Sequence, residues 1–264
     1  MYKRRASFVY CDAVNRTLLW WSFLCAAALV NTAAWGLSAW WLAPDPDIEG
    51  TRRVLLWLSA AYVAGCGFRS FLPMIDVPRF CLHDTAISRI FVGRSVATVA
   101  ELAFVAQWAL LMHEAGAVRA AVAVFVIIVV AEAFSWHAVL TRNDLFHAAE
   151  NALWTVAAAL ATLFLASRWS HEGELGRRVI LVSIACGALY VAFMCVYVVP
   201  MYVRRWHAGG VHLSPAAGMV QVLGHCKVER DWAQWRQDAA WLTPYFTLAV
   251  WLSIALAYAP SLKN

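Results

Sequence analysis

The sequence predicts an all-α polytopic integral membrane protein, a bundle of seven transmembrane helices with a cytoplasmic N-terminus and an external C-terminus. Hydrophobic residues make up 62% of the 264 residues and charged residues only 14%, and the mean hydropathy is +0.62. Soluble domains are about 45–50% apolar and about 25% charged. The apolar residues also fall into seven long runs, and most basic residues lie between these runs.

Each of the seven runs is long enough to cross a bilayer, which requires about 20 helical residues. Their approximate bounds are 18–42, 54–73, 88–112, 117–140, 146–167, 179–203 and 240–259. They leave short connections, so we predict a single transmembrane domain over residues 1–264. The longest connection includes residues 219–236, where tryptophans are mixed with charged residues, and we expect this amphipathic segment to lie at the membrane surface.

Turn-forming residues separate the runs in order. Prolines and a glycine follow the first run within residues 43–50, and Pro73 and Pro78 follow the second. The third and fourth runs are joined by HEAGAVR, the fourth and fifth by TRNDLF, and the fifth and sixth by SRWSHEGELGRR. Several of the 15 tryptophans stand at the ends of runs, as is typical of an interfacial aromatic belt.

The distribution of basic residues predicts the orientation. Thirteen Lys and Arg residues fall on the side of the N-terminus, seven fall on the other side, and Arg94 lies within a run. Because cytoplasmic loops carry the excess of positive charge, the N-terminus is expected in the cytoplasm. This role explains the net charge of +5, so no nucleic-acid partner is predicted, and membrane lipids are the expected partners. The oligomeric state and the host membrane are not indicated.

The seven cysteines predict free thiols. Their number is odd, no C-x-x-C motif occurs, and at least four lie within apolar runs. Buried free cysteines are common in apolar surroundings, whereas disulfide frameworks show even numbers at regular spacings. A disulfide framework is therefore not expected.

The third run carries two charges inside an otherwise apolar stretch. Arg94 and Glu101 share one helical face with Thr98, because a helix advances about 100° per residue. A charge at such depth costs about 2.5–3.5 kcal/mol on insertion scales. We therefore expect both side chains to face the interior of the bundle and to find partners there.

Runs three to five are joined by short connections and are expected to be neighbours. With the predicted orientation, their ionisable side chains converge in the cytoplasmic half of the bundle. The candidate catalytic residues are Glu101, Glu132, His147 and Glu150. The candidate substrate-binding residues are Arg69, Arg94, Asn151, Trp154 and Tyr197.

The chemistry of this cluster leaves several alternatives open. His147 and Glu150 share a helical face, and with Glu101 and Glu132 they form a donor set for a divalent or di-metal centre. His137 is a weaker candidate ligand, because it lies five residues after Glu132 and on a different face. Alternatively, Arg94 and Glu101 form a purely structural ion pair.

The leading functional expectation is a membrane-embedded enzyme that acts on a lipid or lipophilic substrate. The glutamates would serve as general bases or metal ligands, the arginines would hold an anionic headgroup, and His147 would transfer protons or bind metal. Two alternatives remain: a proton-coupled small-solute transporter, and a non-catalytic membrane sensor or assembly factor. The sequence does not decide whether the protein is an enzyme.

The predicted topology resembles that of the progestin and adiponectin receptor family, which also has seven spans and a polar site toward the cytoplasm. The zinc ligands of that family include histidines on the last span, and residues 240–259 contain no histidine. No residue is therefore carried over, and no family is assigned. The apolar runs contain no lysine, which excludes the attachment of retinal through a Schiff base.

Overall fold

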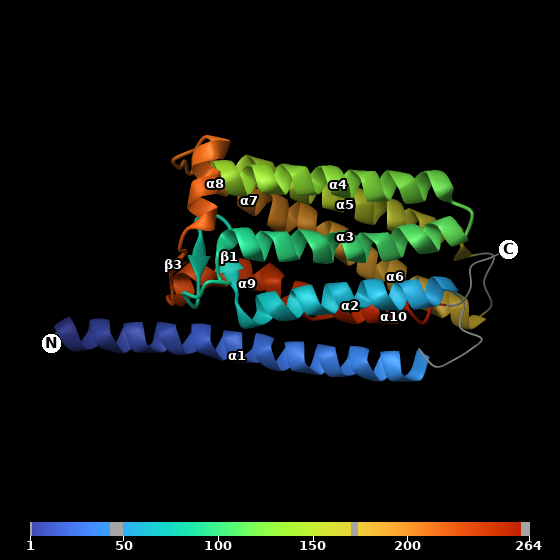
Figure 1. Ribbon diagram of the computed structural model, residues 1–264, viewed down its shortest axis with the longest axis horizontal. Helices are drawn as coiled ribbons and strands as arrows, with labels where there is room; N and C mark the ends of the chain where they lie inside the picture. The colour runs from blue at the N-terminus through green and yellow to red at the C-terminus, as the bar shows by residue number, and fades with distance from the viewer. Residues whose placement is uncertain (1, 43–49, 170–173, 260–264) are drawn as a thin grey trace. The chain divides into compact units, whose positions relative to one another are not determined.

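A computed structural model describes residues 2–42, 50–169 and 174–259 (Figure 1), with side chains from residue 16 onward except at residues 175, 176 and 179. Within this part, seven helical segments are long and apolar enough to cross a membrane. They span Arg16–Leu42, Gly50–Phe71, Ile90–Glu114, Val118–Thr141, Asp144–Ser167, Ile180–His207 and Trp232–Leu256. The predicted class of multi-pass helical membrane protein is confirmed. The connection expected at residues 43–49 and the basic side chains of Lys3, Arg4, Arg5 and Lys263 lie outside the described part.

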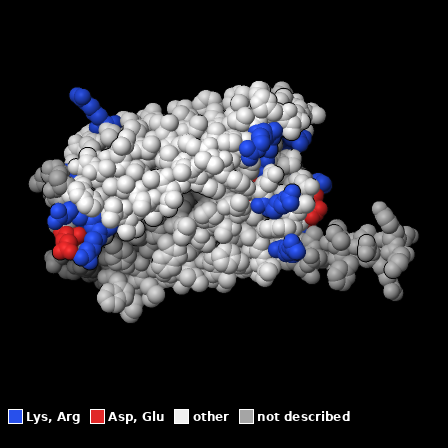
Figure 2. All heavy atoms as spheres, turned by 180° about the vertical axis from the view of Figure 1, so that it is seen from behind, with Lys and Arg blue, Asp and Glu red and all other residues white. Residues whose placement is uncertain are grey.

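The surface agrees with this class. On the face drawn in Figure 2, the described Lys, Arg, Asp and Glu side chains gather near the ends of the helices, and the surface between them is uncharged. Many large apolar side chains of the described residues are exposed, including Leu163, Val196 and Leu248. An exposed apolar surface of this kind is what a lipid environment requires.

The described residues divide into two compact units, the first within residues 2–107 and 219–259 and the second within residues 108–218. The first unit contains α1 (Tyr2–Leu42), α2 (Gly50–Phe71), β1 (Met74–Ile75), β2 (Phe80–Cys81), most of α3 (Ile90–Glu114), β3 (Lys227–Val228), α9 (Trp232–Phe246) and α10 (Leu248–Leu256). The second contains α4 (Val118–Thr141), α5 (Asp144–Ser167), α6 (Glu174–Phe193), a π-helical turn (Met194–Val198) and α7 (Val199–His207). α8 (Pro215–Leu223) begins in the second unit and ends in the first.

The core of the first unit is formed where α1, α2, α9 and α10 pack together. Tyr62 of α2 lies there with Leu242 and Phe246 of α9, and all three are almost fully buried. Gly65 lets α2 approach α3 closely, because a Cβ atom at this position would lie 2.6 Å from the Cβ of Ala100. Small residues at such crossings are typical of packed membrane helices.

The last span is interrupted between α9 and α10. Pro244 lies inside α9, and Thr247 leaves the helical conformation with φ −119° and ψ −81°. Proline lacks a backbone N–H, so a carbonyl of the preceding turn loses its helical donor. Near this break, the side-chain amide of Asn31 donates a hydrogen bond of 2.9 Å to the carbonyl oxygen of Phe246. A polar residue of α1 thus satisfies a backbone group within the apolar core.

The last span also begins earlier than expected, at Trp232 rather than near residue 240. Asp231 caps α9, since its carboxylate accepts a hydrogen bond of 3.0 Å from the backbone N–H of Ala233. The range 219–236, expected as one surface segment, is therefore distributed over the end of α8, the strand β3 and the start of α9.

The short strands form a cap at one end of α2 (Figure 1), defined here as β1, β2, β3 and the first turn of α9. β1 pairs with β2 antiparallel, and β2 pairs with β3 parallel, with Cys81 opposite Val228. Trp235 is fully buried among Ile75, Phe80 and Leu82, and its indole N–H donates a hydrogen bond of 3.0 Å to the carbonyl of Glu229. The cap thus has a small core of its own.

A disulfide joins Cys81 and Cys226 within the cap, with a Cα–Cα distance of 5.9 Å. The expectation that the cysteines are free thiols is therefore wrong for this pair, although it holds for Cys25, Cys66, Cys186 and Cys195. The pairing could not be inferred from spacing, because the two cysteines are 145 residues apart and only the strand pairing brings them together.

Glu229 makes the cap sensitive to acid. Partial burial alone would raise the pKa of Glu229, but hydrogen bonds from the backbone N–H groups of Asp231 and Arg230 and from the Lys227 ammonium lower the pKa below its ordinary value of 4.5. A carboxyl group with a lowered folded-state pKa stabilises the fold above its unfolded pKa, and this contribution is lost as the pH falls through the folded pKa. We therefore expect the unfolding temperature to fall below about pH 4.5, and less steeply in Glu229→Gln than in the wild type.

Thermal unfolding of the solubilised protein between pH 3 and pH 7 measures this effect. Glu174→Gln is the matched control, because Glu174 is an exposed carboxylate at the start of α6. Identical pH profiles for the wild type and Glu229→Gln would show that these hydrogen bonds do not stabilise the folded cap.

The second unit is built on the antiparallel hairpin of α4 and α5. α4 ends at Arg142, which adopts the left-handed conformation with φ 55° and donates its backbone N–H to the carbonyl of Ala138. Asn143 then caps α5, since its side chain accepts a hydrogen bond of 3.1 Å from the backbone N–H of Leu145. This short connection keeps α4 and α5 side by side, with their facing side chains in one layer.

α5 also packs against α6, the π-helical turn and α7. The π-helical turn closes where the backbone N–H of Val199 donates to the carbonyl of Met194, five residues earlier. Pro200 follows directly and has no N–H to donate, which is a common cause of local change in helical register. The sixth span is therefore a continuous helix formed by α6, the π-helical turn and α7, and Tyr197 lies in the π-helical turn.

Candidate functional site

The first unit contains a buried ion-pair network around Glu101 of α3. The Arg94 guanidinium donates a hydrogen bond of 2.8 Å to Oε2 of Glu101, one of the pairings that the sequence left open. The Tyr245 hydroxyl of α9 donates a hydrogen bond of 2.9 Å to Oε1 of the same carboxylate. Both carboxylate oxygens of Glu101 are therefore engaged within this unit.

Asp76, which follows β1, completes this network. Its carboxylate lies 3.9 Å from Arg94 and 3.8 Å from Arg69, and all three side chains are buried. Arg69 also donates a hydrogen bond of 3.0 Å to the carbonyl oxygen of Met74. Two guanidinium groups thus face two carboxylates, Asp76 and Glu101, and their formal charges cancel. The network holds the loop after α2 against α3, which is a structural role.

Sequence reasoning missed two members of this network, Tyr245 and Asp76. Tyr245 lies in an apolar run in which a hydroxyl group is not conspicuous. Asp76 lies in a loop between Pro73 and Pro78, and nothing in the spacing places it opposite α3. One indication of these partners is present in the sequence: two buried arginines, Arg69 and Arg94, require two buried negative charges to balance them.

The second unit contains a different cluster, formed by Glu132 of α4 with His147 and Glu150 of α5. A carboxylate oxygen of Glu132 lies within 4.8 Å of one of Glu150. Nδ1 of His147 lies 2.7 Å from Oε2 of Glu150. The three side chains are only 4%, 5% and 7% exposed, for Glu132, His147 and Glu150 respectively. They are the buried carboxylate and imidazole side chains among the described residues of this unit.

Ser135 adds a polar group next to this cluster. It lies three residues after Glu132 on α4, so the two side chains share the buried face of the helix. Its hydroxyl group is fully buried and has no hydrogen-bond partner among the described residues. A buried hydroxyl group without a partner is costly, unless it serves a bound group.

Residues of α5 and α7 surround the histidine. Asn151 donates a hydrogen bond of 2.8 Å from its side chain to the carbonyl oxygen of His147. The ring of Tyr202 lies 5.1 Å from the imidazole ring, and the guanidinium of Arg205 lies 5.4 Å from the centre of the Tyr202 ring. Tyr202 and Arg205 were not predicted, because α7 reaches α5 only through the tertiary fold.

The other predicted site residues lie as follows. His137 is exposed and its ring lies 4.2 Å from that of Phe146, so it does not belong to the buried cluster. Trp154 is half-buried on α5, one turn after Glu150, and Tyr197 stacks on Phe193 at 5.4 Å. The prediction that Glu101 meets Glu132 and Glu150 concerns residues of different units and stays a prediction.

The cluster of Glu132, His147 and Glu150 has a clear chemical capacity. Two carboxylates this close repel each other when both are ionised. A divalent cation or a shared proton between them removes this repulsion and stabilises the pair. Carboxylate oxygens and an imidazole nitrogen are ligands that Zn²⁺, Mn²⁺ and Fe²⁺ accept. The His147–Glu150 contact can orient a ligating carboxylate, and it also provides a path for a proton.

Comparisons of the chain with protein-family models, with curated proteins and with solved structures found no match.

Proposed function

We propose that the protein is a metal-dependent, membrane-embedded enzyme that acts on a lipid or lipophilic substrate at Glu132, His147 and Glu150. The observation that carries this proposal is the pair of buried carboxylates within 4.8 Å of each other, with an imidazole 2.7 Å from one of them. Ionisable residues inside membrane spans are costly and usually mark functional sites. The fully buried hydroxyl group of Ser135 beside the pair also supports a bound group at this place.

Glu132 and Glu150 would hold a divalent cation. Such an ion polarises a carbonyl or phosphoryl oxygen, or lowers the pKa of a bound water so that it attacks at neutral pH. His147 would hold Glu150 in a fixed orientation and exchange a proton with the substrate. The two carboxylates come from the facing helices α4 and α5, so the hairpin itself would set the geometry of the site.

Arg205 and Tyr202 are the residues that we assign to substrate binding in this unit. Arg205 lies over the Tyr202 ring, which contacts His147, so its positive charge lies near the cluster and would attract an anionic headgroup. Arg69 and Arg94, the headgroup residues expected from sequence, instead contact Asp76, Glu101 and the Met74 carbonyl. Their interactions support a structural role rather than headgroup binding.

A proton-coupled transporter is the second candidate, and the His147–Glu150 contact of 2.7 Å is the observation that favours it. A histidine in contact with a buried carboxylate can load and release a proton as the pH changes. In this alternative the cluster would bind no metal, and Glu132 would accept the proton that Glu150 releases.

Metal analysis of the purified protein tests the leading proposal. We expect protein prepared without chelator to carry a divalent ion at near-stoichiometric amounts. Glu132→Gln and Glu150→Gln should bind it more than about 100-fold more weakly, because each loses an anionic ligand and loss of a residue that only supports a ligand already costs about 10–100-fold. Saturating metal should also raise the unfolding temperature, since a ligand at 100 times its Kd stabilises by about 2.7 kcal/mol.

Glu174→Gln is the matched control, because Glu174 is a glutamate exposed on α6. Its metal content should equal that of the wild type. Absence of bound metal from folded wild-type protein, together with an unchanged unfolding temperature in chelator, would contradict the enzyme proposal. Proton uptake into proteoliposomes that is abolished in Glu150→Gln would then support the transporter. Full cellular function in both glutamine variants would leave only the sensor or assembly factor.

A further inference from the structure

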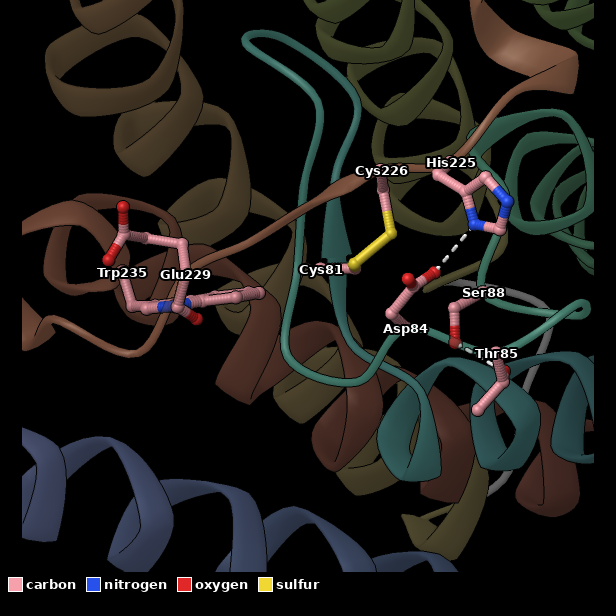
Figure 3. The surroundings of a disulfide bond; sticks show 8 residues. All are labelled: Cys81, Asp84, Thr85, Ser88, His225, Cys226, Glu229 and Trp235. Atoms are coloured by element: carbon pink, nitrogen blue, oxygen red, sulfur yellow. Dashed lines mark hydrogen bonds and ion pairs between the residues drawn. A yellow bond between two sulfur atoms is a disulfide. The ribbon is translucent and has the colours of Figure 1, made fainter.

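The disulfide in the cap carries information about the sides of the membrane. Figure 3 shows Cys81 of β2 bonded to Cys226, which lies directly before β3, with the Asp84–His225 pair on one side and Trp235 on the other. Cys81 is fully buried and Cys226 is 8% exposed. The sulfur atoms are therefore shielded, as in a structural disulfide rather than in a redox-active one.

The disulfide links two of the short segments from which the cap is built. Each strand is only two residues long. β2 and β3 are held by the backbone hydrogen bonds from Lys227 N–H to the Arg79 carbonyl, 3.1 Å, and from Glu229 N–H to the Cys81 carbonyl, 2.9 Å. Strands this short are marginal by themselves. The disulfide adds a covalent constraint between two segments that are 145 residues apart in sequence.

Structural disulfides form and persist in oxidising compartments, and cytosolic thiols are kept reduced. We propose that the cap lies on the oxidising, extracytoplasmic side of the membrane, and that the site at Glu132, His147 and Glu150 takes its lipophilic substrate from the leaflet on that side. The second part of this inference rests on the proposed function, whereas the first part does not.

The count of membrane crossings connects the cap with the site. Cys81 lies in the connection between the second and third spans, and Cys226 lies between the sixth and seventh. The turn at residues 142–143 joins the fourth and fifth spans. In a chain of seven single crossings, these three connections share one side of the membrane. The N-terminus shares that side, and the C-terminus lies in the cytoplasm.

The position of the cluster along its helices places it in the leaflet nearest this turn. Glu150 is the seventh residue of α5, and Glu132 lies nine residues before the end of α4. At about 1.5 Å per residue, they are roughly 9 Å and 14 Å from the turn. The hydrocarbon core is about 30 Å thick, so both carboxylates fall within the nearer half.

The excess of basic residues on the cap side is the opposing observation, because it favours a cytoplasmic cap. Part of this excess has a structural explanation. Arg69 is buried against Asp76, and Arg79 is buried and hydrogen-bonded to Gln221. These two guanidinium groups stabilise the fold from within, so their presence on this side has a cause other than membrane orientation.

Labelling of two matched histidine-to-cysteine variants tests the inference. His212, in the connection on the cap side, and His113, at the opposite end of α3, are both exposed. Each is replaced by cysteine in the full chain, in a background that keeps Cys81 and Cys226 and has alanine at the other cysteines. A membrane-impermeant maleimide should label His212→Cys in intact cells, and His113→Cys only after permeabilisation.

A second measurement determines whether Cys81 and Cys226 are oxidised in the membrane-bound protein. After denaturation, a polymer-tagged maleimide should add to Cys81 and Cys226 only when the sample has been reduced. Labelling of His113→Cys in intact cells, equal labelling of both variants, or thiols that react without reductant would each overturn the inference. The metal content of the purified protein tests the proposed function separately. Failure of the membrane-side inference is therefore distinguishable from failure of the proposed function.

Discussion

Replacement of Arg94 by methionine should lower the free energy of unfolding by about 3–5 kcal/mol, because it leaves the buried carboxylates of Glu101 and Asp76 without their shared cation. Both carboxylates are taken out of water by the surrounding helices, so solvent cannot replace the lost partner. Thermal or denaturant unfolding of the protein in detergent or bicelles measures the effect.

The double variant Arg94→Met with Glu101→Met distinguishes an ion pair from a purely steric effect. Removing both charges should recover much of the loss, because apolar residues of similar volume often replace a buried ion pair at little cost. Arg178→Met is the matched control, since the Arg178–Glu174 pair is about three-quarters exposed and such pairs contribute at most about 1 kcal/mol. Equal destabilisation by Arg94→Met and Arg178→Met would contradict the buried network.

The second large effect is expected from the disulfide. Replacing Cys81 and Cys226 together by alanine should lower the free energy of unfolding by about 2–5 kcal/mol, because the bond closes a loop of 145 residues. Membrane helices that persist in the unfolded state already restrict this loop, so the disulfide removes less conformational entropy and stabilises the fold less than the loop length alone would give. The unfolding temperature of the wild type, with and without a reductant that reaches the cap, should show the same difference.

Cys186→Ala with Cys195→Ala is the control for this experiment, because both thiols are free and exposed. We expect its stability to stay within about 0.5 kcal/mol of the wild type. The stabilising role of the disulfide would be refuted if the Cys81–Cys226 double variant unfolded at the wild-type temperature and the wild type did not respond to reductant. This result does not depend on the side of the membrane on which the cap lies.

The sequence predicted the seven spans because hydropathy is a local property that accumulates over each run of about 20 residues. It also identified Arg94, Glu101, Glu132, His147 and Glu150, since an ionisable residue within such a run is conspicuous by its cost. The spacing of Arg94 and Glu101, and that of His147 and Glu150, made each pairing possible within a single helix. Both of these local pairs are present in the structure.

Where one member of a contact is remote in the sequence, prediction failed. The Tyr245 hydroxyl reaches Glu101 across 144 residues, and Cys81 reaches Cys226 across 145. Neither contact leaves a periodic pattern in the sequence. The parity of the cysteine count even pointed to free thiols, because it cannot reveal that a single pair is bonded.

By itself, the sequence determined that this is a multi-pass membrane protein and which of its residues carry charge at depth. These properties follow from the transfer free energy of each segment, to which every residue contributes independently of its distant neighbours. Only the tertiary structure decided that Asp76 and Tyr245 complete a structural network around Arg94 and Glu101. It also decided that Glu132 and Glu150 face each other beside His147, because pairing between helices depends on packing and loop geometry.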